Sequence, residues 1–325
     1  MGLLRQKGAS TLAPLDPNTG AAREFDAFQD RSVEPADFNE MTDNRQFREE
    51  NGIFVPQRRP QHREEEYSEA GFDQLIRMQR AHFWYLGRHK LLLSVLRKEA
   101  LGRPAGAGVL RAIDMGGGCG GWIEYLHSNA GGAFRELALG DSSMRALSLA
   151  GPVVGKFAKR YQIDLLDLVW SETWDVVFLL DVLEHIPDHA AVLQQVRKSM
   201  RRGGLLFVTT PALKRFWTYN DDLAHHQRRY CSQDFHDLGR QTGLEIVRTD
   251  YFMFLLSPAL LLSRLLFRPA KSATQEQRQD HLERTHRVPA RPINAVLAQI
   301  FSIEASMVNN VRFPWGTSIL AVFRK

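Results

Sequence analysis

The chain has 325 residues, of which 44% are hydrophobic, and a formal net charge of +5. This composition is that of a globular protein with a sizeable core. The charge is too small to indicate nucleic-acid binding, although it suits an anionic partner or a membrane surface. Two cysteines, Cys119 and Cys231, are too few and too distant for a disulfide framework or a zinc motif, so we expect a cytoplasmic protein.

Residues 1–66 are polar, with scattered prolines and a charged cluster at Arg63–Glu66. A segment of this kind cannot bury enough apolar surface to fold by itself, and we predict a largely disordered arm. The remaining residues, 67–325, are predicted to form one domain.

The domain is predicted to open with a helical cap over residues 67–107. A helix begins near Ser68, with apolar residues spaced as on one helical face. The aromatic run at 82–85 interrupts this pattern, and a second helix covers 91–96.

From residue 109 onward, predicted strands alternate with predicted helices. Near-continuous apolar strands of this kind belong to parallel sheets covered by helices on both faces. The fold class is therefore α/β, with a Rossmann-like, mostly parallel sheet of seven strands that ends in an antiparallel C-terminal pair. The predicted strands cover residues 109–113, 136–139, 158–161, 176–180, 205–209, 244–250 and 318–323, and the predicted helices cover 122–129, 144–149, 190–201 and 232–242.

An apolar and basic insertion, residues 251–292, is predicted before the last strand. Its first part, Tyr251–Phe267, is interrupted by Pro258 and Arg264. This part is too short to span a bilayer core of about 30 Å, which requires about 20 apolar residues. The segment is either a helical insertion packed on the domain or an interfacial anchor that touches a membrane peripherally.

The most informative segment is Ala112–Gly121, with the letters AIDMGGGCGG. Glycines after a buried strand allow positive φ and a close approach to a ligand, and the helix predicted next points free N–H groups into the loop. Gly116, Gly118 and Gly121 match the dinucleotide fingerprint. Asp114, Gly116, Gly118 and Gly120 match the D-x-G-x-G-x-G loop of S-adenosylmethionine (SAM) methyltransferases. The loop alone therefore indicates an adenosine-containing cofactor.

Two further aspartates stand where such a cofactor needs acceptors. Asp141, followed by Ser142, ends the second predicted strand of the domain and would take the ribose hydroxyls, which both kinds of cofactor require. Asp164 follows the third strand and would accept from the adenine amino group, with Leu165 covering a face of the ring. A solvated loop aspartate is the alternative for Asp164.

The segment Trp174–Asp188, WDVVFLLDVLEHIPD, separates the two cofactors. Here the chain resembles class I SAM-dependent methyltransferases, in the subgroup that includes small-molecule and quinone-pathway O-methyltransferases. The other motifs of the resemblance are AIDMGGGCGG, GDSS and RRGGLLFVTTPA, and together they cover about residues 70–325. The resemblance implies a Rossmann-like fold with SAM as the cofactor.

The resemblance also implies roles for individual residues. Gly116 would approach the methionine part of SAM, Asp141 would hold the ribose, and Leu180 would line the site. Arg88, in the cap motif HFWYLGR, would pair with the SAM carboxylate, with a surface arginine as the alternative. The family's usual cysteine at the second loop position is replaced by glycine here, and Cys119 stands two positions later.

Two histidines are candidates for activating an acceptor. His185 follows the fourth strand, at the sheet edge where ligands bind, and His226 follows the fifth; an imidazole is the usual general base near neutral pH. Each has a structural alternative, such as capping a helix or lying in a solvated loop. We expect no metal, because adjacent residues in the segment 221–226 cannot easily converge on one ion. The run Arg228–Tyr230 either binds an anionic acceptor or anchors its loop.

The expected function is methyl transfer from SAM to a small-molecule or lipid-like acceptor, most readily at oxygen. No nucleic-acid acceptor is expected, because the chain has neither an Asn/Asp-Pro-Pro-aromatic tetrapeptide after the fourth strand nor a Pro-Cys nucleophile. The alternatives are a nicotinamide-dependent oxidoreductase and a non-catalytic SAM-binding protein. The expected location is the cytoplasm, with peripheral membrane contact if Tyr251–Phe267 touches lipid.

Overall fold

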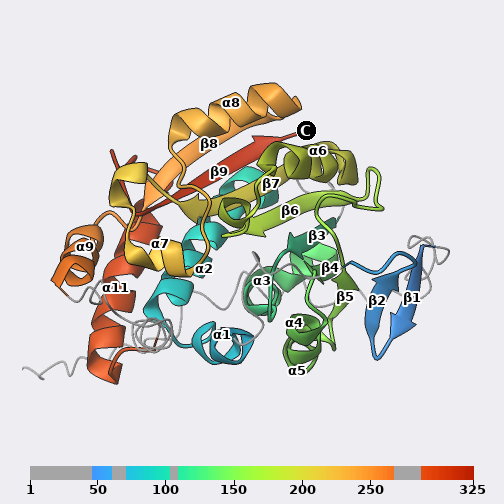
Figure 1. The fold of residues 1–325 in the computed structure, drawn as a ribbon, viewed down its shortest axis with the longest axis horizontal. Helices are drawn as coiled ribbons and strands as arrows, with labels where there is room; N and C mark the ends of the chain where they lie inside the picture. Colours follow the sequence, from blue (N-terminus) through green and yellow to red (C-terminus); the bar gives the residue numbers. More distant parts are fainter. Residues whose placement is uncertain (1–45, 61–70, 103–108, 267–286) are drawn as a thin grey trace, which may run out of the picture. The chain divides into compact units, whose positions relative to one another are not determined.

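A mixed β-sheet forms the centre of the fold in the computed structural model, which describes residues 46–60, 71–102, 109–266 and 287–325 (Figure 1). The strands are β1 Phe47–Glu50, β2 Ile53–Pro56, β3 Leu110–Met115, β4 Phe134–Asp141, β5 Ala158–Gln162, β6 Trp174–Leu180, β7 Met200–Pro211, β8 Glu245–Phe252 and β9 Ser318–Arg324. Their order across the sheet is β1-β2-β5-β4-β3-β6-β7-β9-β8. The five adjacent strands β5, β4, β3, β6 and β7 are parallel to one another, whereas β9 is antiparallel to both of its neighbours, β7 and β8.

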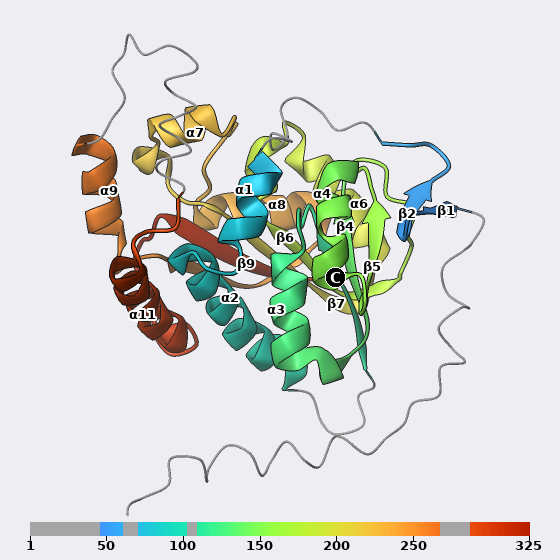
Figure 2. The same ribbon diagram turned by 90° about the horizontal axis from the view of Figure 1, so that it is seen from below.

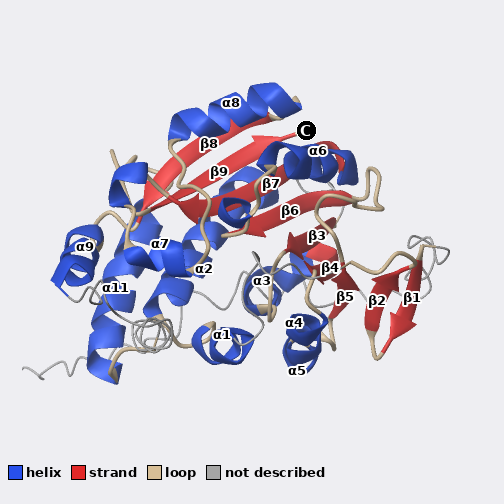
Figure 3. Ribbon diagram, viewed as in Figure 1, coloured by secondary structure: helices blue, strands red, loops and turns tan. Residues whose placement is uncertain are grey.

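Helices cover both faces of this sheet, as Figure 3 shows. The α-helices are α1 Phe72–Met78, α2 Phe83–Leu96, α3 Gly121–Ala130, α4 Met144–Leu149, α5 Gly151–Val154, α6 His189–Ser199, α7 Tyr219–Leu223, α8 Ser232–Thr242, α9 Ser257–Leu266 and α11 Arg291–Met307. Four short helical turns are η4 Arg97–Leu101, which is π-helical, and the 3₁₀ turns η5 Gly131–Ala133, η6 Leu183–His185 and η7 Lys214–Phe216.

The alternation of side chains along β6 explains why two layers of helices are needed. Val176, Phe178 and Leu180 point into a core shared with α2, α3 and α11. Val177 and Leu179 point the other way, into a core shared with α6 and α8. Successive strand residues face opposite sides of a sheet, so the continuous apolar run at 176–180 of β6 must be covered on both sides.

The α/β class and the seven strands predicted from residue 109 onward are confirmed as β3 to β9, with β8 and β9 forming the predicted antiparallel pair. The helices predicted over 144–149 and 232–242 have the same bounds in the structure. For α4 the reason is local, because the side chain of Ser143 accepts a hydrogen bond from the N–H of Ala146 and fixes the first turn.

The expectation of a disordered arm through residue 66 is wrong for the described part of that arm. Residues 47–56 form the hairpin β1–β2, and β2 extends the sheet by pairing in parallel with β5. The turn is Asn51-Gly52, with φ values of 52° and 72°, which is the dipeptide that two-residue hairpins favour. Phe47 and Phe54 pack against the ring of Tyr161, at centroid distances of 5.2 and 5.1 Å. Residues 1–45 and 61–66 lie outside the described residues.

The cap differs from its prediction at the start of the second helix, whereas the predicted start of the first helix, near Ser68, lies outside the described residues. Helix α2 begins at Phe83, so the aromatic run at 82–85 starts a helix and does not interrupt one. His82 is the N-cap, and its side chain accepts from the N–H of Trp84. This helix is buried over much of its circumference, between α3 and α11, and a helix buried on several sides has no clear polar face to reveal its period.

The predicted insertion 251–292 contains parts of three elements. Tyr251 and Phe252 complete β8, α9 follows, and α11 begins at Arg291 and packs along α2. The carboxylate of Glu304 in α11 accepts hydrogen bonds from the N–H groups of Phe254 and Leu255. Figure 2 and Figure 1 both show α9 beside α11. Across the described residues, no helix is both long and apolar enough to cross a membrane; residues 267–286 lie outside them.

Candidate active site

The glycine loop connects β3 to α3 at the carboxyl end of the sheet. Gly116, Gly118 and Gly120 have φ values of +77°, +55° and +80°, a region that only glycine adopts without strain. The N–H of Gly116 donates to the carbonyl of Gly140 at 2.7 Å, which holds the loop against the end of β4. A Cβ atom on Gly116 would lie 2.7 Å from Cγ2 of Val182. The loop therefore requires glycine for its conformation and for its close packing.

Asp141 lies at the end of β4, directly against this loop. One carboxylate oxygen accepts from the N–H of Gly118 and the other from the N–H of Ser143, both at 2.9 Å. Its neighbour Ser142 offers its carbonyl to Nε2 of Gln162 at 3.0 Å. Each carboxylate oxygen can accept more than one hydrogen bond, so Asp141 can orient the loop and still accept from a ligand hydroxyl.

Asp114 is a buried acid in β3, below the loop. Its side chain is 2% exposed, and its Oδ1 atom has no hydrogen-bond partner among the described residues. Burial raises the pKa of Asp114 to about 7, against the opposing charge of Arg88 and with the support of Asp141 and Asp181. An unpartnered buried acceptor of this kind marks a place where a donor is missing.

Arg88 in α2 reaches the same region from the cap. Its guanidinium forms an ion pair with Asp181, the residue after β6, and lies over the rings of Trp84 and Tyr85 at 4.5 and 5.3 Å. The alternative prediction for Arg88, a surface arginine, is wrong, because the residue is only 7% exposed. The resemblance assigned Arg88 to the SAM carboxylate; in this structure its partner is Asp181.

These residues fit the cofactor that the resemblance implies. SAM carries a cationic sulfur and an ammonium group, and the carboxylates of Asp141 and Asp181 exceed the single positive charge of Arg88 in this region. The orphaned Oδ1 of Asp114 and the glycine cradle are two independent signs of a ligand site. Helix α1 covers the loop, since Phe72 and Leu75 pack with Cys119.

The remaining predicted cofactor residues lie at neighbouring strand ends. Asp164 follows β5, its Oδ1 accepts from the N–H of Leu166 at 2.9 Å, and it lines a cavity of about 1060 Å³ next to the hairpin β1–β2. Leu165 packs against the core on the α6 side. Leu180 ends β6, and its side chain, 7% exposed, packs in the core that β6 shares with α2 and α3.

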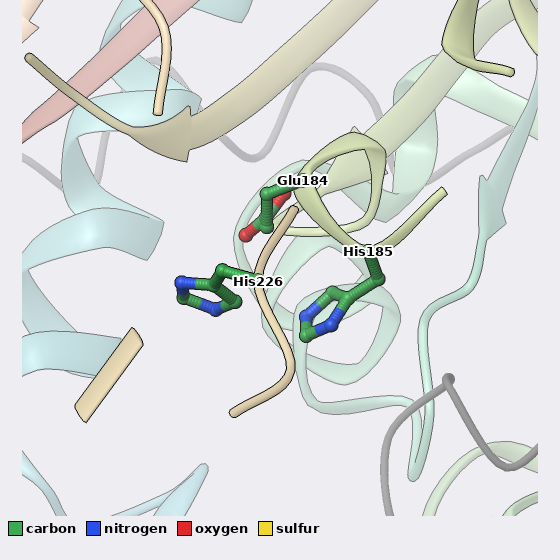
Figure 4. Close-up of side chains that lie close together, drawn as sticks. All are labelled: Glu184, His185 and His226. Atoms are coloured by element: carbon green, nitrogen blue, oxygen red, sulfur yellow. The ribbon is translucent and has the colours of Figure 1, made fainter. Parts of the chain in front are cut away.

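The two candidate catalytic histidines lie together at the carboxyl end of β6 (Figure 4). The rings of His185 and His226 meet edge to face, with their centroids 4.9 Å apart. The buried carboxylate of Glu184 lies beside them. Burial and the neighbouring His226 lower the pKa of His185 to about 3, so His185 is neutral at physiological pH.

Asp221 positions His226. Nδ1 of His226 lies 3.0 Å from Oδ1 of Asp221, and Asp221 also accepts from Arg229 at 2.7 and 3.0 Å. Although burial opposes ionisation, hydrogen bonds from His226 and Arg229 hold the pKa of Asp221 well below its usual range. The His226 ring is therefore fixed by an ionised acceptor on its Nδ1 side.

The run Arg228–Tyr230 anchors its loop, which is one of its two predicted roles. Arg228 donates to the carbonyl of Pro187 at 2.9 Å, and Arg229 donates to the carbonyl of Ala212 at 3.0 Å. The Tyr230 hydroxyl donates to the carbonyl of Leu183 at 3.2 Å. All three side chains therefore tie the loop to the edge of the sheet near η6.

Sequence reasoning missed three charged residues of this site: Asp181, Glu184 and Asp221. Asp181 has φ of 59°, and its partner Arg88 is 93 residues away, so neither fact was visible in the sequence. The sequence suggests Asp221 only as a metal ligand in the segment 221–226, whereas in the structure its carboxylate pairs with His226 and Arg229. The expectation of no metal was based on that segment and did not consider Glu184 and His185 together.

Comparisons with known proteins agree with the geometry of the glycine loop. A family model described as a methyltransferase domain matches residues 76–249. A solved structure from Galdieria sulphuraria, provisionally described as a sarcosine dimethylglycine methyltransferase, is similar at 14% identity and a TM-score of 0.50, covering 74% of this chain and 86% of that one. Phosphoethanolamine N-methyltransferase 2 of Haemonchus contortus, in complex with SAM, matches at 15% identity and a TM-score of 0.49, covering 79% of this chain and 57% of that one. A search of curated protein sequences gave no match.

The matched range contains the glycine loop, the end of β4 and the segment after β6, which are the motifs that carried the resemblance. It decides between the two patterns that the loop alone left open. The chain therefore belongs to the methyltransferase domain family, among the class I SAM-dependent methyltransferases, and SAM is its cofactor.

Proposed function

We propose that the chain transfers the methyl group of SAM to an oxygen atom of a small-molecule or lipid-like acceptor. SAM supplies a methyl group on a positively charged sulfur when it is bound. The glycine loop, Asp114 and Asp141 are the residues that would hold it, and the imidazoles of His185 and His226 would face the acceptor. All of them lie at the carboxyl edge of the parallel strands, where open α/β sheets bind their ligands.

The observation that carries the oxygen acceptor is the pairing of His226 with Asp221. An ionised carboxylate only accepts hydrogen bonds, so in the neutral form of the His226 ring the proton lies on Nδ1 and Nε2 carries the lone pair. Nε2 can then take the proton of a hydroxyl as the oxygen attacks the methyl group. A positioned general base of this kind contributes about 10²–10⁴ in rate.

Alignment is the other contribution of the protein. Methyl transfer from sulfur is an in-line displacement, and holding donor and acceptor in register contributes roughly 7–11 kcal/mol. The loop conformation is set by Gly116, Gly118 and Gly120, and Asp141 ties it to β4. The ion pair of Arg88 with Asp181 connects the cap to the end of β6, between the cofactor side and the histidines.

The test is methylation of cell extracts with isotopically labelled SAM, followed by mass spectrometry of every product that gains a methyl group. We expect a methyl ether or methyl ester as the product. His226→Asn should lower the rate by about 10²–10⁴, whereas His225→Asn, at an exposed residue with φ of 56°, should leave it unchanged. A methylated amine or carbon as the main product would contradict the oxygen acceptor, and no product at all would favour a non-catalytic SAM-binding protein.

Exposed apolar residues on α9 and α11 support a lipid-like acceptor. Leu262 and Leu266 of α9 are 55% and 68% exposed, and Ile293 and Val296 of the neighbouring α11 are 57% and 60% exposed. Exposed apolar side chains on amphipathic helices are typical of segments that contact a membrane interface. Tyr251 and Phe252, at the start of the predicted anchor, are part of β8 and do not contribute to it.

Flotation of the protein with vesicles that contain anionic lipid tests this surface. The double variant Leu262→Ser with Leu266→Ser should move the protein from the vesicle fraction to the soluble fraction. Val109→Ser is the control. Val109 is also an exposed apolar residue, 52% exposed, but it lies just before β3, outside α9 and α11. Equal recovery of the wild type and the double variant with vesicles would exclude this membrane contact.

A further inference from the structure

Glu184, His185 and His226 form a cluster of three side chains at the carboxyl end of β6. One carboxylate oxygen and one nitrogen of each imidazole ring lie within 4.8 Å of one another (Figure 4). The first two residues belong to η6, and His226 belongs to the loop after α7. The N–H of Gln227 donates to the carbonyl of Glu184 at 2.7 Å, so the backbone fixes the two segments side by side.

Glu184 is the member of this cluster that nothing else in the site explains. Its side chain is 0% exposed, and within the described ranges neither carboxylate oxygen has a hydrogen-bond partner on another residue. The nearby guanidinium groups have other partners, since Arg88 pairs with Asp181 and Arg229 pairs with Asp221. A buried carboxylate without a partner is strongly unfavourable, and a bound cation would remove that penalty.

His226 has the hydrogen-bond partner that a metal-binding histidine usually has on its second ring nitrogen. Its Nδ1 atom donates to Asp221, and metal-binding histidines usually donate their second ring N–H to a carboxylate or a carbonyl group. Asp221 is in turn held by Arg229 and by the N–H of Thr218 at 2.7 Å. This arrangement fixes the His226 ring and leaves Nε2 free to bind a cation.

We infer that Glu184, His185 and His226 bind one divalent first-row transition-metal cation, of the kind represented by Zn²⁺. Two imidazole nitrogens with one carboxylate form the donor set of catalytic zinc sites, which keep a further position open. Imidazole donors favour such cations, whereas Mg²⁺ prefers oxygen ligands. The cation would draw the three ligand atoms closer together than they are in its absence.

The site goes beyond the proposed function, and only its catalytic role rests on that function. A hydroxyl group bound at the open position of such a cation has a lowered pKa. In that case the hydroxyl loses its proton to solvent, and the Nε2 atom of His226 binds the cation in place of accepting the proton itself.

Equilibrium dialysis of the full chain tests the site directly, after treatment with a chelator and without SAM or acceptor. The probe is Zn²⁺, in the presence of excess Mg²⁺. We expect one Zn²⁺ per chain for the wild type and binding at least about 100-fold weaker for Glu184→Gln and His226→Asn. His225→Asn, in the adjacent exposed residue, should bind as the wild type does.

Thermal unfolding keeps the test independent of any loss of structure in the variants. Zn²⁺ should raise the melting temperature of the wild type and of His225→Asn, and it should leave that of Glu184→Gln unchanged. The inference is overturned if the wild type binds no stoichiometric Zn²⁺, or if Glu184→Gln and His226→Asn bind it as tightly as the wild type. Because SAM is absent throughout, neither result depends on methyl transfer, and loss of methyl transfer alone leaves the cation site standing.

Discussion

Replacing Asp114 by asparagine should make the protein more stable at neutral and alkaline pH. The side chain is buried in β3 with an orphaned oxygen, and its pKa is raised from 3.8 to about 7, chiefly by burial. The folded state therefore holds a proton that the unfolded state releases near pH 4. Stability that is fully present below pH 4 is therefore lost progressively as the pH rises from about 4 to about 7, and the loss levels off once the folded carboxyl is ionised.

The structure sets the size of this effect. The shift is about three pH units, and each unit corresponds to about 1.4 kcal/mol, so ionised Asp114 lowers the free energy of unfolding by about 4 kcal/mol above pH 7. Water screens this buried charge very little, because Asp114 is 2% exposed. Asparagine has nearly the same shape and no charge, so the gain of the variant over the wild type should grow by about 2–3 kcal/mol between pH 5 and pH 8.

The assay is urea unfolding of both proteins from pH 5 to pH 8.5, without SAM, followed by tryptophan fluorescence. Titrating groups away from this site affect both proteins alike, so the difference between the two unfolding free energies reports Asp114 together with the charges coupled to it, Arg88, Asp141 and Asp181. On the proposed assignment of Asp114 to the SAM site, Asp114→Asn should also bind SAM more weakly at a pH where Asp114 is ionised. A stability difference that does not change with pH would refute the reasoning about this acid.

Packing predicts three further changes in stability, measurable by unfolding or by proteolysis. Gly116→Ala should lower the free energy of unfolding by about 1–3 kcal/mol, because alanine is strained at φ of +77° and its Cβ would lie 2.7 Å from Val182; unchanged stability would show that the loop adapts. Gly87→Ala should lower it by about 1–3 kcal/mol, because the new Cβ overlaps the ring of Phe301 and pushes α11 off α2; an unchanged melting curve would contradict that close contact. Phe54→Ala removes a ring stacked on the sheet side of the hairpin, and protease should then cut near residues 47–56 much faster; equal cleavage of both proteins would argue against hairpin docking.

Most of the sheet could be predicted because its signals are local. Strands such as β6, which is apolar at every position from 176 to 180, have one common explanation in an α/β protein. The hairpin β1–β2 also had a local signal, the Asn51-Gly52 turn between two short strands, but the charged residues around it hid the alternation. Helix α11 repeats apolar residues at helical spacing over 293–301, so the sequence contained it as well.

The site could be predicted only as far as it depends on motifs. The glycine loop and Asp141 follow from spacing, and the structure places both at one edge of the sheet. The pairing of Arg88 with Asp181 depends on how the cap packs on β6, and the isolation of Glu184 depends on that pairing in turn. No pattern in the sequence records which buried acids have partners, because partners come from segments far apart in the chain.

Calorimetric titration of the full chain with SAM, its demethylated product S-adenosylhomocysteine, and NAD tests the central claim most directly. The wild type should bind SAM and S-adenosylhomocysteine with one site per chain and should not bind NAD. Asp141→Asn, which keeps the shape of the side chain that the loop contacts, should lose most of the affinity for SAM. Tight binding of NAD, or SAM affinity that Asp141→Asn leaves intact, would contradict the assignment of this site as a SAM-dependent methyltransferase centre.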